Sequence, residues 1–365
     1  MSHKAGSDDG RDQAPPPRPS SNPALTLPCR PEEVDDFLSQ PTAKVVECLT
    51  RIPGPILVLG AGGKIGLHLS MMLRKALAAV ERRDRVIAVS RFKSIHAREV
   101  FESHGVATHD CDLMDPAGLA ALPEAPTVFF LAGVKFGTAS ARELLHQANV
   151  VMPGQVAARF RSSRIVAFSS GCVYPFVTPA SGGATEATPV DPVGDYALSC
   201  VGRENAFAEA SLKYGTAVAL IRLNYAVEFR YGTLVDIAQK VVRGEPVDVT
   251  MGYFNAIWQT DAVAHSILAL ELAKSPATPL NVTGSQILSV REIALRFGEL
   301  FGRKVHLTGT EAPTAWLNNP AYAQNRLGAP RTRLDDMLKW VTAWLKNEGR
   351  TWGKPTGFER RDGRF

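Results

Sequence analysis

The sequence has 365 residues, of which 45% are hydrophobic and 21% are charged, and its formal net charge is +5. This ordinary balance excludes a wholly disordered or fibrous chain, and the length allows a large buried core. The small basic excess lies mainly near the termini and forms no Lys/Arg stripe among aromatic residues, so we expect no nucleic-acid partner. No stretch approaches the ~20 apolar residues of a membrane-spanning helix, so we expect no membrane association.

The first part of the chain divides into a tail and a helical extension. Residues 1–22 are polar and Pro-rich and do not resemble a secretory signal, which predicts a flexible tail. In residues 23–52, apolar positions 34, 37 and 38 and then 45, 46 and 49 recur at helical spacing after a proline. We expect this extension to pack beside the main domain rather than to act as an arm in a dimer.

From residue 55 onward, short apolar runs alternate with amphipathic stretches. The runs are PILVLGAG, RVIAVSR, TVFFLAG, RIVAFSS, AVALIRL and PLNVTG. This alternation predicts an α/β fold, a doubly wound parallel sheet of the Rossmann type. We expect a dinucleotide-binding domain over residues 53–222, a smaller substrate-binding α/β region interleaved with the sheet over 223–348, and a C-terminal tail over 349–365.

A glycine-rich loop follows the first predicted strand. It comprises Gly60, Ala61, Gly62, Gly63, Lys64, Ile65 and Gly66 and leads into an amphipathic helix. Glycines let backbone N–H groups approach a pyrophosphate closely, and the helix N-terminus adds partial positive charge. The loop therefore predicts dinucleotide binding, with Gly60, Gly62, Gly63, Lys64, Ile65 and Gly66 at the cofactor.

The second predicted strand ends in Ser90 and Arg91, where folds that prefer NAD place an acidic residue. A Ser-Arg pair does not supply that carboxylate, whereas Arg pairs well with a 2′-phosphate. We therefore expect NADP as the preferred cofactor, with NAD as the alternative.

Five cysteines, at positions 29, 48, 111, 172 and 200, are scattered without CxxC spacing. They indicate reduced thiols and a cytoplasmic protein rather than a disulfide framework or a zinc site. The eight histidines also lack metal-ligand spacing, and we expect no metal.

Several motifs resemble the extended short-chain dehydrogenase/reductase superfamily, specifically its NAD-dependent epimerase/dehydratase group. The resemblance covers residues 53–345 and rests on GAGGKIG, CDL at 111–113, VFFLAG, SSGCVYP and YALSC. It implies that Asp112 and Leu113 lie by the adenine, that Leu131, Ala132 and Gly133 line the cofactor, and that Asn149 is a structural asparagine.

The same resemblance implies the catalytic residues. The family's YxxxK tyrosine matches Tyr196, which would transfer the substrate hydroxyl proton and contact the cofactor, and the orienting hydroxyl matches Ser170. The family's lysine, however, is replaced by Cys200. The chain has lost catalysis, or its reaction needs a weaker base, or another cation substitutes, for which we nominate Lys135. A nucleophilic Cys200 is disfavoured because apolar packing is the common fate of a helical cysteine.

The substrate half departs from the family pattern as well. Gly171 and Cys172 replace the Asp-Glu pair of 4,6-dehydratases, and the arginine expected before Asp261 is absent. A smaller sugar, sugar acid or polyol is therefore at least as good a candidate as a nucleotide sugar. Residues of a type suited to sugar rings and carboxylates fall in this region, and we assign substrate contact to Asn224, Tyr225, Arg230 and Trp258.

Taken together, these features predict an NAD(P)-dependent oxidoreductase or epimerase that acts on a carbohydrate-like alcohol or ketone. The alternative is a non-catalytic NAD(P)-binding sensor or scaffold that has lost the active-site lysine. A homodimer is an expectation from the resemblance alone, since no residue identifies its interface.

Overall fold

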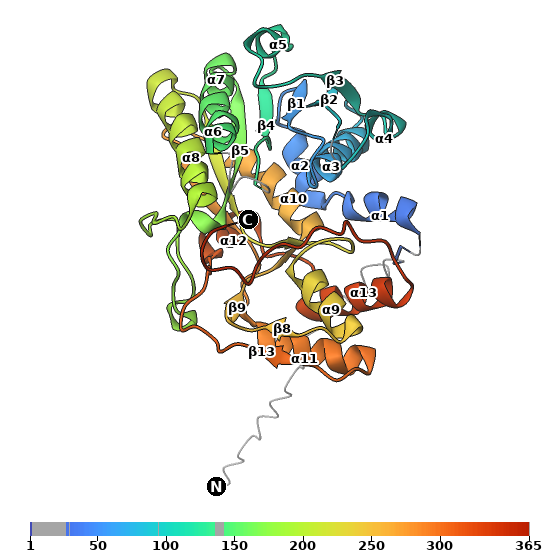
Figure 1. The fold of residues 1–365 in the computed structure, drawn as a ribbon. Helices are drawn as coiled ribbons and strands as arrows, with labels where there is room; N and C mark the ends of the chain where they lie inside the picture. The colour runs from blue at the N-terminus through green and yellow to red at the C-terminus, as the bar shows by residue number, and fades with distance from the viewer. Residues whose placement is uncertain (2–26, 29, 94, 136–141, 365) are drawn as a thin grey trace.

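The structure, a computed structural model, describes residues 1, 27–28, 30–93, 95–135 and 142–364. A seven-stranded parallel sheet in the order β11-β6-β5-β4-β1-β2-β3 forms its centre (Figure 1). The strands are β1 (Ile56–Leu59), β2 (Val86–Ser90), β3 (Ala107–Asp110), β4 (Thr127–Phe130), β5 (Arg164–Ser170), β6 (Val218–Leu223) and β11 (Thr278–Val282). The predicted doubly wound fold is thereby confirmed.

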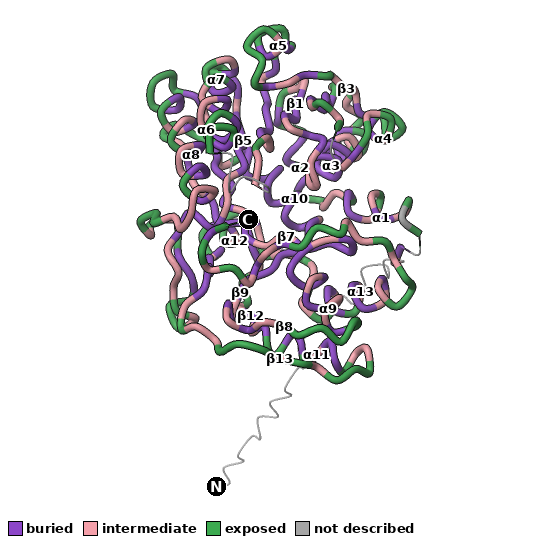
Figure 2. The backbone as a smooth tube through the Cα atoms, in the orientation of Figure 1, coloured by how far each residue is buried: buried purple, intermediate pink, exposed green. Residues whose placement is uncertain are grey.

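Both faces of the sheet are covered, which is why its strands are short runs of apolar residues rather than alternating ones. Ile56 and Val58 of β1 join a core cluster on one face, whereas Leu57 and Leu59 join a cluster on the other. Figure 2 shows the buried backbone concentrated in the strands and in the helices that face them.

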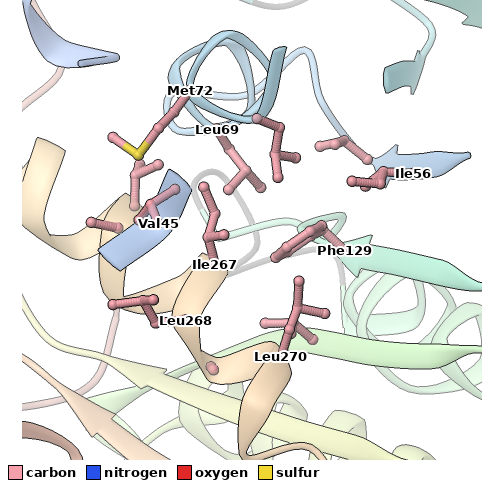
Figure 3. Packing of buried hydrophobic residues seen from close by; sticks show 14 of the residues in the cluster. Val45, Ile56, Leu69, Met72, Phe129, Ile267, Leu268 and Leu270 are labelled. Carbon is pink, nitrogen blue, oxygen red and sulfur yellow. The ribbon is translucent and has the colours of Figure 1, made fainter. Parts of the chain in front are cut away.

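Helices and a short 3-10 turn pack on the first face. The main ones are α2 (Ala43–Leu49), α3 (Gly66–Ala79), α10 (Gln259–Leu268) and the turn η4 (Ala269–Glu271). Figure 3 shows Val45, Leu69 and Ile267 from three of these elements meeting Ile56 and Phe129 of the sheet. The other face is covered by α5 (Pro116–Ala121), α7 (Met152–Arg159) and α8 (Asp195–Tyr214).

The lower part of Figure 1 is a second cluster built mainly from helices. It contains α1 (Pro31–Leu38), α9 (Thr233–Arg243), α11 (Val290–Phe301) and α13 (Leu334–Lys346). Six two-residue strands pair beside it: β7 (Ala226–Val227) with β10 (Ile257–Trp258), β8 (Val247–Asp248) with β13 (Leu307–Thr308), and β9 (Tyr253–Phe254) with β12 (Leu288–Ser289). Because β11 returns to the main sheet, the two parts are interleaved along the chain.

The remaining elements are short. They are α4 (Arg98–Ser103), α6 (Arg142–His146), α12 (Ala321–Leu327), the π-helix η1 (Gln147–Val151) and the 3-10 turns η2 (Gly171–Val173) and η3 (Pro179–Ser181). The tail predicted over residues 1–22 lies, apart from Met1, outside the described residues. In the part of the chain that the structure describes, no helix is long and apolar enough to cross a membrane.

The strand register determines where a ligand can bind. Leu59, the last residue of β1, pairs with both Val89 of β2 and Phe130 of β4. The three strands therefore end at one level, and the segments that follow them lie side by side. The strand order reverses between β1 and β4, and open α/β sheets bind ligands at the carboxyl ends of the strands at such a point.

Candidate active site

The glycine-rich loop joins β1 to α3, in the strand–turn–helix arrangement that the sequence predicts. Gly60 has φ +80°, and a Cβ there would lie 2.5 Å from the backbone nitrogen of Ala132. A Cβ on Gly66 would overlap the backbone of Ala61. A Cβ on Gly63, by contrast, would meet no protein atom closer than 3.7 Å. The chain's own packing thus requires glycine at positions 60 and 66, whereas Gly63 leaves room for a ligand at the N-terminus of α3.

The segments after β2 and β3 lie side by side next to the glycine loop, where the sequence analysis expects the adenosine. Arg91 and Asp112 lie together, with Nη1 of Arg91 3.3 Å from Oδ2 of Asp112, and both side chains are largely exposed. The Ser90 hydroxyl accepts a hydrogen bond from the backbone N–H of Phe92. Leu113 is buried in the core beneath them. An arginine and a carboxylate therefore lie together at the ends of these two neighbouring strands.

A cavity of about 250 Å³ lies where β1, β4, β5 and β6 end. It brings together seven residues assigned to the site from the sequence: Lys64, Ile65, Lys135, Ser170, Tyr196, Asn224 and Tyr225. They come from the glycine loop, the segment after β4, the end of β5, the start of α8 and the segment after β6. These contributions from separate parts of the chain meet only because the strands are parallel and in register.

Tyr196 and Cys200 lie one turn apart on α8, and Cys200 is fully buried. The two side chains are hydrogen-bonded, and burial raises the pKa of the Tyr196 phenol well above its usual value. A hydrogen bond from the Cys172 thiol lowers the pKa of Cys200 to about 7 and raises that of Cys172. The position of the family's lysine is therefore occupied by a thiol within a pair of neighbouring cysteines.

Lys135 places an ammonium over the ring of Tyr196. Its Nζ lies 5.6 Å from the centroid of the Tyr196 ring, and burial lowers the pKa of this ammonium. The preceding residue is fixed by Asn149 in η1, whose amide both accepts from Val134 N–H and donates to Val134 C=O at 2.9 Å. The Asn149 carboxamide thus holds the backbone from which Lys135 reaches the cavity.

Arg203, which the sequence analysis did not assign, lies one further turn along α8. Its guanidinium donates to Oδ1 of Asn149 at 2.8 Å and to the carbonyl of Phe168 at 3.1 Å. Its positive charge acts to lower the pKa of both Tyr196 and Cys200. The signal in the sequence was its spacing of seven residues from Tyr196, which puts both side chains on one helix face.

Ser169 and Ser170, at the end of β5, have different partners. Ser170 Oγ lies 3.0 Å from Cys172 Sγ and accepts from the backbone N–H of Cys172. The neighbouring Ser169 donates to Glu204 at 2.6 Å, and Glu204 is paired with Arg222 through a 2.6 Å contact between Oε2 and Nη2. This pair fixes the end of β5 against α8 and β6.

Two residues assigned to the substrate from the sequence lie elsewhere. Arg230 is buried, donates to Glu228 and to Asp35, and stacks on Trp352. Trp258 is also buried, in the core cluster of the second part. Neither residue lines the cavity. They were assigned to the substrate by residue type and chain position, which carry no information about these long-range contacts. Of the other cofactor candidates, Gly133 packs against Arg203 and Asn149, and Leu131 and Ala132 follow β4 beside the glycine loop.

Ten further described residues of the cavity wall were not assigned to the site from the sequence. They are Ser169, Cys172, Leu223, Ala226, Tyr231, Thr233, Gln259, Trp316, Thr356 and Phe358. The last two belong to the C-terminal segment, dark red in Figure 1, which was given no chemistry. Thr356 is anchored there by Asp236 of α9, which accepts hydrogen bonds from its backbone N–H at 2.7 Å and its hydroxyl at 2.6 Å. Within the described ranges, no group of three His, Cys, Asp or Glu side chains is arranged to hold a metal ion.

Comparison with known proteins places this geometry in a family. Residues 56–232 match the model of the NAD dependent epimerase/dehydratase family. This segment is an epimerase/dehydratase domain. The match covers the glycine loop, Lys135, Ser170 and Tyr196, and it confirms the resemblance seen in the motifs. No curated protein matches the chain.

Solved structures share the fold over most of the chain at low sequence identity. MoeE5 in complex with UDP-glucuronic acid and NAD has a TM-score of 0.65 and 21% identity, covering 81% of this chain and all of that one. UDP-glucuronic acid 4-epimerase from Bacillus cereus with NAD has a TM-score of 0.67 and 16% identity, covering 80% and 99%. DesIV, a dTDP-glucose 4,6-dehydratase from Streptomyces venezuelae, has a TM-score of 0.68 and 18% identity, covering 80% and 97%.

Proposed function

We propose that this chain catalyses NAD(P)-dependent hydride transfer on a carbohydrate-like alcohol or ketone, as an oxidoreductase or an epimerase. The observation that carries the proposal is the convergence of Tyr196, Ser170 and Lys135 on one cavity, which also adjoins the glycine loop. The room at Gly63 and the N-terminus of α3 fit a dinucleotide pyrophosphate. When bound, the cofactor supplies a nicotinamide ring that accepts or returns a hydride.

The side chains of the cavity supply the proton chemistry. Ser170 donates to the substrate oxygen and orients it, and Tyr196 takes the hydroxyl proton or gives it back through its phenolic oxygen. Lys135 stabilises the phenolate by its charge, in place of the lysine that Cys200 replaces. An epimerase retains its nucleotide through both hydride steps, whereas a dehydrogenase must release it.

The preference for NADP rests on Arg91 at the end of β2. Its pairing with Asp112 brings a carboxylate to the same place, and several of the similar solved structures are complexes with NAD. If Arg91 binds a 2′-phosphate, Arg91→Ala weakens NADPH binding and leaves NADH binding unchanged. Equal binding of NADH and NADPH by the native protein would contradict the preference.

The residues of the cavity support a sugar-like substrate. Solved relatives bind UDP-glucose or UDP-glucuronic acid, and a sugar-containing substrate agrees with the hydroxyl, amide and aromatic groups around Tyr196. The cavity volume of about 250 Å³ lies below the ~300–1,000 Å³ usual for sites that enclose drug-sized ligands. It therefore favours a small reacting sugar at this point. The homodimer and the cytoplasmic location stay predictions.

One observation favours a second function. Cys200 occupies the lysine position and is fully buried, as expected of a chain that binds nucleotide as a sensor or scaffold without turnover. The first experiment is mass spectrometry of nucleotide released from the denatured protein, with NADH and NADPH titrations beside it. Retained nucleotide supports an epimerase, and dissociable binding supports a dehydrogenase or reductase.

The second experiment measures hydride transfer with a panel of sugars, sugar acids and nucleotide sugars. Turnover that Tyr196→Phe abolishes supports the enzyme. Nucleotide binding without transfer on any member of the panel supports the sensor. If the protein neither retains nor binds a nucleotide, both proposals are wrong.

A further inference from the structure

The charges around the cavity are unbalanced. Among its described wall residues, Lys64 and Lys135 carry amines, and none carries a carboxylate. Lys64 belongs to the glycine loop and Lys135 to the segment after β4, so the two reach the cavity from neighbouring strands of the sheet. Each lowers the free energy of any anion that enters the space between them.

Lys64 lies against an aromatic residue of the cavity wall. Its Nζ lies 3.1 Å from the centroid of the Tyr231 ring, a cation–π contact with a residue of the segment between β7 and α9. Burial, the charge of Lys135 and the charge of Lys354 lower the pKa of Lys64 to about 7. An anion bound beside Lys64 would favour its charged form and offset the free-energy cost of burying the ammonium.

Two carboxylates that act on Lys64 through their charge also bond to other groups. Asp236 and Glu228 act on Lys64 through their charge, but neither lines the cavity. Asp236 accepts two hydrogen bonds from Thr356. Glu228 accepts from Arg230 and from the indole N–H of Trp352. The wall of the cavity, as far as the structure describes it, thus carries two amines and no carboxylate.

We propose that the reacting substrate carries a carboxylate and that Lys64 binds it. This inference rests on the proposed function of the cavity and narrows its substrate to sugar acids. The other anion within reach of a glycine-loop lysine is the pyrophosphate of the dinucleotide. The substrate carboxylate is favoured because Lys64 lies against Tyr231 and shares the cavity wall with Tyr196, whereas the loop backbone and α3 are placed to bind the pyrophosphate.

The test measures binding rather than turnover, so it is independent of catalysis. Isothermal titration calorimetry compares D-glucuronate with D-glucose, and UDP-glucuronic acid with UDP-glucose, on the protein alone and saturated with NADH or NADPH. In each pair that shows binding, we expect the acid to have a dissociation constant about tenfold lower than that of its neutral partner, or lower still, as a charged hydrogen bond implies. Lys64→Met should remove this preference, and Lys64→Arg should keep it.

Lys354→Met is the matched control, because it removes an exposed positive charge that acts on Lys64 but does not line the cavity. It should leave the preference intact. Equal binding of acid and neutral partners, no binding of either acid, or a preference that survives Lys64→Met would each overturn the inference. Weaker NADH binding in Lys64→Met with the acid preference unchanged would assign Lys64 to the pyrophosphate instead. An acid preference that Lys64→Met removes, without any hydride transfer, would uphold the carboxylate site at Lys64 while refuting the proposed enzyme.

Discussion

Replacing Lys135 by methionine removes the cation that faces Tyr196 while keeping the length of the side chain. The Lys135 ammonium lies 5.6 Å from the centroid of the Tyr196 ring, and two unit charges at about this separation interact by about 3 kcal/mol at an effective dielectric constant of ~20, or about two pKa units. The pKa of Tyr196, already raised by burial, should rise by about this amount in Lys135→Met. Below that pKa, the fraction of tyrosinate then falls about 100-fold.

The assay is the pH profile of kcat/KM for hydride transfer with a substrate from the panel. The rise of activity with pH, which reports tyrosinate formation, should move about two pH units upward in Lys135→Met. Lys213→Met is the control, because Lys213 lies exposed on α8, near the ring of Tyr214 and away from the cavity. An unshifted profile with full activity in Lys135→Met would refute the role of this lysine.

Three further predictions concern binding and stability. Glu204→Ala leaves the buried Arg222 guanidinium without its carboxylate and should lower the free energy of unfolding in urea by about 3–5 kcal/mol. Adding Arg222→Met should restore most of this loss in the double variant. A loss below ~1 kcal/mol in Glu204→Ala would contradict the prediction. Gly63→Ala should keep the native melting temperature but weaken NADH binding. Gly66→Ala should weaken NADH binding and, in addition, lower the free energy of unfolding by ~1–3 kcal/mol. Equal melting temperatures for the two variants would refute the steric argument. The pKa of Lys64 is lowered from 10.5 to about 7 in the folded chain, so unfolding takes up a proton between these two pH values. The free energy of unfolding therefore rises with pH across this window, and the difference in melting temperature between wild type and Lys64→Met should shrink. A constant difference would contradict the lowered pKa.

Local sequence was enough to predict the sheet and the cofactor side of the site. The strands follow from short apolar runs, and the glycine loop from the spacing of Gly60, Gly63 and Gly66 between a strand and a helix. Tyr196 and Ser170 were assigned because their motifs have fixed positions within such a fold. Each of these features depends on residues close together in the chain.

The substrate side could not be predicted in the same way, because it depends on contacts between distant segments. Arg230 was assigned to substrate by its type, but Asp35, 195 residues away, engages it in the structure. Phe358 was placed in a tail without chemistry, yet it lines the cavity. Neither pairing leaves a periodic or motif signal in the sequence.

The cavity is walled by segments from Lys64 to Phe358, so it exists only when the sheet and the C-terminal segment are both in place. A compound that binds there therefore selects the fully folded chain over every partly folded form. At a hundred times its dissociation constant, such a compound stabilises the native state by about 2.7 kcal/mol. A rise in melting temperature thus gives a label-free screen for the unknown substrate, one that needs no turnover and reports the whole molecule at once.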